Sequence, residues 1–365
     1  MTLPHLPADL AQRLLAYYDE YGRDLPWRQQ QDLYRIWLSE IMLQQTGVKT
    51  VMPYYEKFLS HFPSITQLAA ASQEQVLAQW QGLGYYRRAR MLHQAAQQVV
   101  QQHGGLFPEE ITQVQALPGI GPSTAAAILA IGRNQAHTIL DGNVMRVLAR
   151  LLTLELPVDS TPGKQRLWQV ARQLTSQQRP GDYAQAIMDL GATLCTRSQP
   201  ACSRCPWGGA CAARQHGSWA EYPKKREKKP KPHHYQCMWV LLDTQQRIFL
   251  RKRPLEGLLG GLWEPLGEPL LETPPLGNLV QRASHHLTAL GIQGQPLLEA
   301  QPVDHIFTHF RLTVYPILVV AASGAPILND ANWWPLAQLD QRPIATLHRK
   351  VNENAVGLVE LSLNG

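Results

Sequence analysis

The chain has 365 residues, of which 44% are hydrophobic and 17% are charged. This length accommodates two domains, and no run of about eighteen apolar residues marks a transmembrane helix. A formal net charge of +6 and a pI of about 9.1 favour a polyanionic partner. The N-terminal stretch "MTLPHLPADL" lacks the pattern of a secretion signal, so we expect a cytoplasmic protein with no membrane partner.

The first half of the chain, from about residue 8 to residue 222, is predicted to be mainly helical. Apolar residues recur at helical spacing in segments that each end at Gly, Pro or Asn. The clearest segments are "DLAQRLLAYYDEYG", "ITQLAAAS", "QEQVLAQWQGLG", "RRARMLHQAAQQVVQQHGG" and "STAAAILAIGRN". No alternating strand pattern appears before residue 234, which predicts an all-α domain.

The stretch "WLSEIMLQQTG", Trp37 to Gly47, reads as a helix with an acid on its apolar face. Burying a carboxylate is costly unless the group is paired or stays protonated. Glu40 is therefore a candidate for chemistry. The face that contains it is Leu33, Ile36, Trp37, Glu40, Ile41 and Gln44.

The stretch "GLGYYRRAR", residues 82–90, places two tyrosines beside three arginines after a glycine turn. Aromatic rings stack on bases or wedge between them, while arginines meet phosphates, so this stretch is a candidate nucleic-acid contact. A solvated basic helix start with a tyrosine packed beneath it is the alternative.

The stretch "LPGIGPSTAAAILA", residues 117–130, places two glycines between helical segments. Gly119 and Gly121 allow a tight turn whose N–H groups point outward near a helix start. That geometry suits a phosphate oxygen and reads no base sequence. A plain turn between two helices is the alternative.

The stretch "ILDGNVMRVLAR" places Asp141 directly before a helix with an apolar stripe. Aspartate is a favoured N-cap, which explains the residue without catalysis. The two roles are compatible, because the helix dipole favours an ionised carboxylate at an N-terminus. Such a group would stabilise a developing sugar cation.

Four of the five cysteines follow the spacing C-x6-C-x2-C-x5-C at Cys195, Cys202, Cys205 and Cys211. In a chain expected to stay inside the cell, such clustering favours a metal or iron–sulfur site over disulfides. The spacing suits four-coordinate zinc and a cubane cluster equally, so both remain open.

The sequence pattern changes from helical to strand-like after "KKREKKPK", Lys224 to Lys231, which carries six positive residues and one negative residue. We predict a helical domain over 1–222 with a cysteine loop at 195–211, a basic linker over 223–234, and a smaller α/β domain over 235–365. The strongest strand candidates are "MWVLLD", "RIFLRKR" and "LTVYPILVVAA", and the strongest helix is "NLVQRASHHLTALG".

Together these motifs resemble helix-hairpin-helix DNA glycosylases with an iron–sulfur loop, and most closely adenine glycosylases of the MutY type, over roughly residues 10–222. The resemblance implies a [4Fe–4S] cluster at the four cysteines. It assigns the catalytic acid to Glu40 and the catalytic aspartate to Asp141. An endonuclease III-like lyase would carry a lysine at the position of Ser123, and serine forms no imine with an opened sugar.

The same resemblance implies a set of residues that contact DNA or the displaced base. Gln44, Gln45 and Tyr85 match the wedge around the displaced base, and Arg28 and Leu43 match the adenine pocket. Ser123 is expected to help position the water or the base. The full DNA- and base-binding set is Arg28, Leu43, Gln44, Gln45, Tyr85, Gly119, Gly121 and Asn143.

The C-terminal half resembles, more loosely, the Nudix-like domain of adenine glycosylases, which recognises 8-oxoguanine opposite adenine. "LLGGLWE" matches the loop before a Nudix box, but the acidic cluster of that box is missing, so no Nudix hydrolase activity is expected. The lesion-recognition loop of the family corresponds to Phe307, Thr308 and His309. An ordinary strand connection is the alternative.

The predicted function is monofunctional hydrolysis of the N-glycosidic bond of adenine mispaired with 8-oxoguanine or guanine in base excision repair. The alternatives are an endonuclease III-like lyase on oxidised pyrimidines and a catalytically silent lesion-binding protein. We expect a monomer that binds double-stranded DNA, on the nucleoid if the source is bacterial. The basic linker is a candidate contact for repair or replication proteins.

Overall fold

The fold is that of a computed structural model, which describes residues 6–28, 30–227, 229–271, 278–289, 291, 294–321 and 330–363. By their contacts, residues 1–70 and 91–228 form one compact unit, and residues 71–90 and 229–365 form a second. The domain limits and the linker drawn from the sequence stay predictions. Among the described residues, no helix has both the length and the apolarity needed to cross a bilayer.

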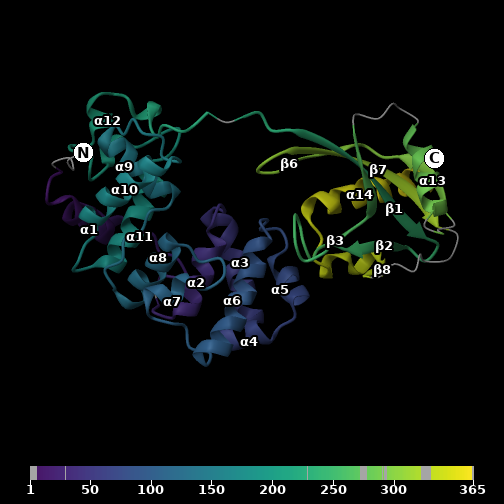
Figure 1. The fold of residues 1–365 in the computed structure, drawn as a ribbon, viewed down its shortest axis with the longest axis horizontal. Coiled ribbons are helices and arrows are strands. Elements are labelled where there is room, and N and C mark those ends of the chain that lie inside the picture. The colour runs from purple at the N-terminus through teal and green to yellow at the C-terminus, as the bar shows by residue number, and fades with distance from the viewer. Residues whose placement is uncertain are drawn as a thin grey trace. The chain divides into compact units, whose positions relative to one another are not determined.

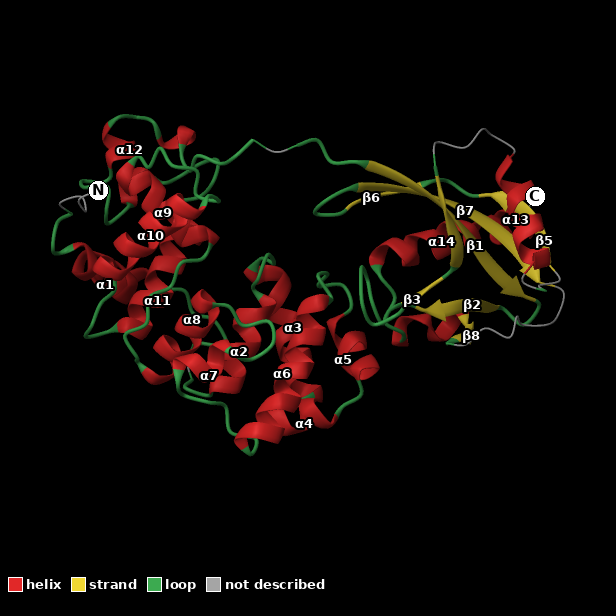
Figure 2. Ribbon diagram, viewed as in Figure 1, coloured by secondary structure: helices red, strands yellow, loops and turns green. Residues whose placement is uncertain are grey.

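The first unit is built from helices, as predicted (Figures 1 and 2). A π-helix at Leu190–Leu194 and short 3-10 helices at Cys202–Arg204 and Trp219–Glu221 complete the C-terminal part of this unit. The helices are α1 (Leu10–Tyr21), α2 (Leu33–Met42), α3 (Val48–His61), α4 (Ile65–Ala70), α6 (Arg87–His103, from Met91 on), α7 (Ile111–Gln115), α8 (Pro122–Arg133), α9 (Gly142–Leu152), α10 (Thr161–Leu174), α11 (Pro180–Asp189) and α12 (Ala212–Gln215).

Helix α2 has an aspartate cap at its start and ends earlier than its periodicity predicts. The Asp32 side chain caps it by accepting from the N–H of Tyr34 at 2.9 Å. The helix ends at Met42, and Gln45 has a φ of 60°, which a right-handed helix excludes. The expectation that the helix runs to Gly47 is therefore wrong for its last turn.

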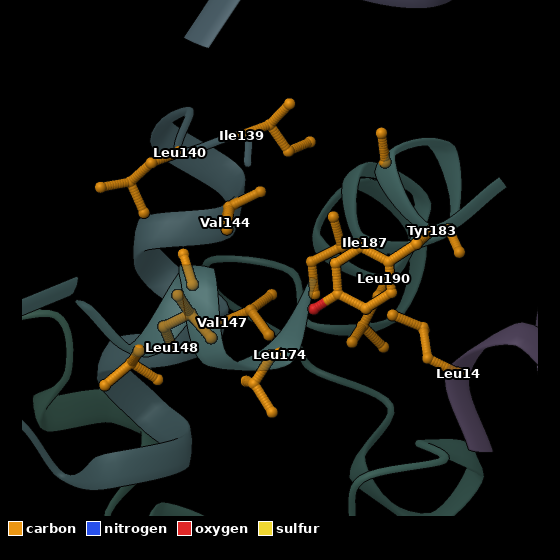
Figure 3. Close-up of a cluster of buried hydrophobic side chains, with 14 of the residues drawn as sticks. Leu14, Ile139, Leu140, Val144, Val147, Leu148, Leu174, Tyr183, Ile187 and Leu190 are labelled. Carbon is orange, nitrogen blue, oxygen red and sulfur yellow. The ribbon is translucent and has the colours of Figure 1, made fainter. Parts of the chain in front are cut away.

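A buried apolar cluster joins α1, α9, α10 and α11 and fixes the start of α9 (Figure 3). Ile139 and Leu140, just before Asp141, are buried in this cluster, and so is Val144, just after it. Figure 3 shows these three side chains on the same side of the cluster as Val147. Burying each such side chain contributes roughly 1.5–3 kcal/mol, so the backbone on both sides of Asp141 is firmly held.

The second unit contains a mixed sheet of eight strands in its described residues (Figure 2). The central strands β1 and β7 are parallel and paired along their full length, and the remaining pairs are antiparallel. The elements are α5 (Gln73–Trp80), β1 (His233–Asp243), β2 (Arg247–Lys252), β3 (Trp263–Glu264), β4 (Leu266–Leu270), α13 (Asn278–Ala289), β5 (Gly294–Glu299), β6 (Val303–Ile306), β7 (Arg311–Ala321), β8 (Ala331–Pro335) and α14 (Thr346–Leu363).

Each face of this sheet is covered by one helix. Alternate residues of β1 point to opposite faces, as the period of two in a strand requires. Met238 and Val240 pack in the cluster of α14, while Cys237 and Trp239 pack in the cluster of α13. The predicted order, an all-α part followed by a smaller α/β part, is confirmed. Segment 272–277, where part of a Nudix box would lie, is outside the described residues.

Candidate active site

Glu40 lines a cavity in the first unit that contains about 390 Å³ of empty space, part of it open to solvent. The walls come from α2, from the segment before it, and from α8 and α11. Burial, together with the charge of Asp141 and against the opposing effect of Arg28, raises the pKa of Glu40 to about 7. Glu40, the acid predicted on the apolar face of the helix, therefore keeps its proton close to neutral pH.

Arg28 is held in the wall of this cavity by Asp189 at the end of α11. Its two terminal nitrogens donate to the two carboxylate oxygens at 2.7 and 2.6 Å, and the side chains are 9% and 10% exposed. Arg23 donates to the same carboxylate at 2.5 and 2.8 Å. Although burial acts to raise it, Arg28 and Arg23 hold the pKa of Asp189 below its ordinary value. Such a buried pair fixes the guanidinium of Arg28.

Asp141 caps α9 with one carboxylate oxygen. Its Oδ1 accepts from the N–H of Val144 at 2.7 Å, and Asn143 Nδ2 lies 3.5 Å from Oδ2. Burial raises the pKa of Asp141, and the N–H groups of Val144 and Asn143 with Arg146 oppose that rise. From the sequence we expected the helix dipole to keep Asp141 ionised. Burial outweighs the effect of the helix start, so the pKa values of both Asp141 and Glu40 are raised.

Ser123, at the start of α8, accepts a hydrogen bond from the N–H of Leu140 at 2.9 Å. Leu140 directly precedes Asp141, so this hydroxyl anchors the segment that carries the carboxylate. The role of Ser123 in positioning a water or the base stays a prediction.

The residues after α2 form a turn at the cavity. Leu43 lines the cavity and is half-buried. Gln44 reaches α8, with its Nε2 3.5 Å from Thr124 Oγ1. Gln45 is exposed with a positive φ. The structure therefore places these predicted base contacts on a turn, where their side chains are less constrained than on a helix.

The two glycines of the hairpin between α7 and α8 have different environments. Gly119 has a φ of 80°, and a Cβ there would lie 2.7 Å from the Cβ of Met91, so no other residue fits. Gly121 caps α8, is exposed, and has open space where a Cβ would lie. The N–H groups at the start of α8 are thus accessible to an anion.

Asn143 connects the start of α9 to the cysteine loop. Its Oδ1 accepts from Arg146 at 3.0 Å, and Arg146 also donates to the carbonyls of Cys195 at 2.8 Å and Gly191 at 2.7 Å. One arginine therefore links the capping turn of Asp141 with the first cysteine of the loop.

The four cysteines line one cavity of about 340 Å³ of empty space, part of it open solvent, together with Arg150 and Trp219. Burial, helped by the neighbouring cysteines, raises the pKa of Cys205 to about 11. Thiols gathered in this way can bind a metal ion or cluster once they lose their protons. In the described part of the chain, no group of three or more His, Cys, Asp or Glu side chains forms a ready metal site.

In the second unit, Tyr85 lies at an exposed turn. It has a φ of 48° and is 49% exposed. The turn is held by Trp80, whose Nε1 donates to the carbonyl of Gly84 at 3.1 Å, and by Arg88, whose guanidinium lies over both the Trp80 and the Tyr85 rings.

Phe307, Thr308 and His309 form the connection between β6 and β7. Phe307 is half-buried against Phe310, with ring centroids 4.7 Å apart, whereas Thr308 and His309 are exposed. Lys231 donates to the carbonyl of Phe307 at 2.7 Å. The polar pair is thus presented to solvent at the tip of a braced hairpin.

Several cavity residues were missed by the sequence reasoning, with Gln185 the most informative. It lies on α11, is 7% exposed, lines the cavity with Glu40, and its Oε1 accepts no hydrogen bond within the described residues. A buried amide oxygen without a partner in the wall of a cavity can accept a hydrogen bond from a bound ligand. The others are Arg23, Leu25, Trp27, Ser39, Val48, Ile131 and Met188.

Comparisons with known proteins show the family to which this chain belongs. Residues 38–172 match the family described as the HhH-GPD superfamily base excision DNA repair protein, and residues 237–354 match the NUDIX domain. The chain is 34% identical to the adenine DNA glycosylase of Rattus norvegicus, covering 95% of this chain and 79% of that protein. The chain belongs to the adenine DNA glycosylases. It is a base excision repair hydrolase that acts on an N-glycosyl bond.

Two further comparisons agree with this family. The adenine DNA glycosylase of Buchnera aphidicola subsp. Acyrthosiphon pisum is 34% identical, covering 85% of this chain and 86% of that protein. The structure of a thermostable thymine-DNA glycosylase is similar with a TM-score of 0.52 at 25% identity, covering 56% of this chain and 95% of that one. The predicted family, fold class and enzyme class are confirmed.

Proposed function

We propose that this adenine DNA glycosylase removes adenine that is mispaired with 8-oxoguanine or guanine, and that it does so without a lyase step. The observation that carries the proposal is Glu40, an acid with a pKa of about 7 that lines a cavity and whose pKa is also raised by the charge of Asp141. Adenine inside a duplex is unreachable, so it must be extruded into such a cavity.

Glu40 is the proton donor in this proposal. Its proton goes to a ring nitrogen of the extruded adenine, and the electron pair of the C1′–N bond leaves with the base. Arg28, fixed by Asp189, and Gln185, with its free buried oxygen, are placed to orient the base in the cavity. Orientation of this kind lowers the entropic part of the barrier.

Asp141 is the partner that stabilises the sugar after the base leaves. Its carboxylate offsets the positive charge that develops at C1′, through space or through a covalent intermediate, before water adds there. Ser123 anchors the segment of Asp141, and no lysine lines the cavity among the described residues. Both features favour a monofunctional hydrolase over a Schiff-base lyase.

The DNA contacts in this proposal come from several turns. Gly119 and Gly121 present N–H groups to a phosphate, while Gln44, Gln45 and Tyr85 fill the space of the displaced base. Asn143 contributes from the start of α9. Thr308 and His309, exposed beside Phe307, are the proposed contacts to 8-oxoguanine, since hydroxyl and imidazole groups can bond its altered edge.

A [4Fe–4S] cluster at Cys195, Cys202, Cys205 and Cys211 belongs to the same proposal. The donor set fits, because the four thiols share one cavity and Arg150 Nη1 lies 3.4 Å from Cys195 Sγ. When bound, the cluster would supply a rigid anchor for the loop that Arg146 ties to the start of α9. Metal analysis of the purified protein that finds zinc in place of iron contradicts this assignment.

A gel assay tests the proposed function directly. A labelled duplex with adenine opposite 8-oxoguanine or guanine is incubated with the protein and analysed with and without alkali. We expect strand cleavage only after alkali, with the 8-oxoguanine duplex preferred. Spontaneous nicking supports a lyase, and an intact adenine strand under both conditions refutes the proposal.

The pH dependence of excision follows from the pKa of Glu40. The acid form is required and its pKa is about 7, so the single-turnover rate should fall about tenfold per pH unit above that value. At acidic pH the rate should fall again as Asp141, whose pKa burial raises above its ordinary value, becomes protonated. Binding of a duplex with an uncleavable adenine analogue, measured over the same range, is the control. A rate that stays constant from pH 6 to pH 9 contradicts the assignment of Glu40.

A further inference from the structure

Glu74, on α5 in the second unit, is the centre of a charged contact with the C-terminal sheet. Its two carboxylate oxygens accept from Lys252 Nζ at 2.9 Å, Trp263 Nε1 at 3.0 Å and Arg342 Nη1 at 3.2 Å. The three donors come from β2, β3 and the segment before α14. All four side chains are partly or fully shielded from solvent, with Glu74 28% exposed.

The donors are themselves fixed in place, which separates this contact from an ordinary surface ion pair. The ammonium of Lys252 lies 5.7 Å from the centre of the Trp263 ring, and the guanidinium of Arg342 lies 3.5 Å from that of Trp334. The Trp263 and Trp334 rings pack edge to face. A single exposed pair contributes little, whereas a network with low side-chain freedom contributes more.

Close packing accompanies the charged contact. A Cβ on Gly261, in the loop before β3, would lie 3.2 Å from Gln73 Nε2 and 3.3 Å from Leu77 Cδ1, both on α5. Arg90 donates to the carbonyl of the neighbouring Gly260 at 2.7 Å, and its side chain is buried. Residues 71–90 therefore dock on the C-terminal sheet from both ends of the segment.

The docked helix leads directly to the turn of Tyr85. Glu74 and Trp80 are six residues apart on α5, about 9 Å along the helix. Trp80 donates to the carbonyl of Gly84, and Arg88 donates to the carbonyls of Leu83 and Gly84. Tyr85 is thus carried on a turn whose backbone is bonded to the helix that Glu74 fixes.

We propose that Glu74 is a positioning residue that couples the C-terminal domain to the Tyr85 turn, so that the base opposite adenine influences how Tyr85 is presented to DNA. The inference rests on the proposed function, in which Tyr85 fills the displaced base's space and the C-terminal domain reads 8-oxoguanine. It assigns the preference for 8-oxoguanine in part to a contact that lies outside the lesion loop. Glu74 itself touches no substrate.

The test is Glu74→Gln in the full-length protein, with excision rates measured on adenine opposite 8-oxoguanine and opposite guanine. The rate on adenine opposite 8-oxoguanine divided by the rate opposite guanine should decrease by a factor of about 5 to about 150, the range of typical coupling between sites. The rate opposite guanine should change little, since the cavity of Glu40 is intact. Adding Lys252→Met should lower the ratio no further, because both changes break one network.

Amide hydrogen exchange over residues 82–86 of the free protein is the second readout. Glu74→Gln should accelerate exchange there, whereas the control Glu268→Gln, which breaks an ion pair with Arg282 elsewhere in the second unit, should not. Equal loss of both excision rates, or an unchanged ratio with unchanged exchange, overturns the inference. If the unsubstituted protein shows no preference for 8-oxoguanine, the proposed lesion recognition fails, and exchange alone then decides whether Glu74 positions the turn.

Discussion

Replacing Glu40 with glutamine should lower the single-turnover excision rate by about 10²- to 10⁴-fold, the usual contribution of a positioned general acid. Glutamine has nearly the same shape, so the cavity should remain, but it has no acidic proton to give to adenine. Affinity for the duplex that contains the mispair should therefore be retained. Rates and binding are measured on the same duplex with adenine opposite 8-oxoguanine.

The matched control for this substitution is Glu56→Gln on α3, where the glutamate is exposed and lies outside the cavity. Its excision rate should equal that of the unsubstituted protein. Glu40→Gln also removes a carboxyl whose charged form is disfavoured by burial, so its thermal midpoint should be unchanged or higher. Near-normal excision by Glu40→Gln would show that another group protonates the base.

The position of Glu40 was predictable from local sequence because the period of a helix decides which face it occupies. The end of the same helix was not predictable from periodicity. Gln44 continues the apolar stripe in sequence, yet the chain leaves the helix after Met42 and Gln45 takes a positive φ. Nothing in the local pattern of "LQQTG" distinguishes a last helical turn from a turn at the edge of a cavity.

The wall of the cavity depends on contacts between residues far apart in the chain. Arg28 and Asp189 are separated by 161 positions, and neither residue type nor spacing indicates that they pair. Gln185, one turn before Asp189 on α11, also lines the cavity through packing between segments that are far apart in the chain. Periodicity identifies the buried face of α11, but only the packing of α11 beside α1 and α8 shows which polar group on that face meets Glu40.

The assignment of residues 71–90 was equally beyond the sequence. Their helical pattern matches that of the neighbouring helices, and the predicted domain limits placed them with the first half. By their contacts they group with residues 229–365, while the predicted domain limits themselves stay predictions. Glu74, Lys252 and Arg342 are ordinary charged residues in the sequence. Only the structure shows that Lys252 and Arg342 both donate to the carboxylate of Glu74.

Asp141→Asn is expected to lower the excision rate about 10²- to 10³-fold, the cost of removing one preorganised electrostatic contact to the transition state. The side chain has two roles here, because it caps α9 through Val144 and lies near Glu40. Asparagine caps a helix about as well as aspartate. The substitution therefore removes the charge and leaves the cap.

The companion variant Asp141→Ala removes both the charge and the cap, which separates the two roles of the residue. Relative to Asp141→Asn, it should lose a further 0.5–2 kcal/mol of unfolding free energy, about the value of an N-cap. Its excision rate should match that of Asp141→Asn if the charge is what catalysis requires. If Asp141→Asn instead retains near-normal excision while Asp141→Ala does not, the residue acts by shaping the start of α9, and the stabilisation of the sugar must come from another group in the cavity.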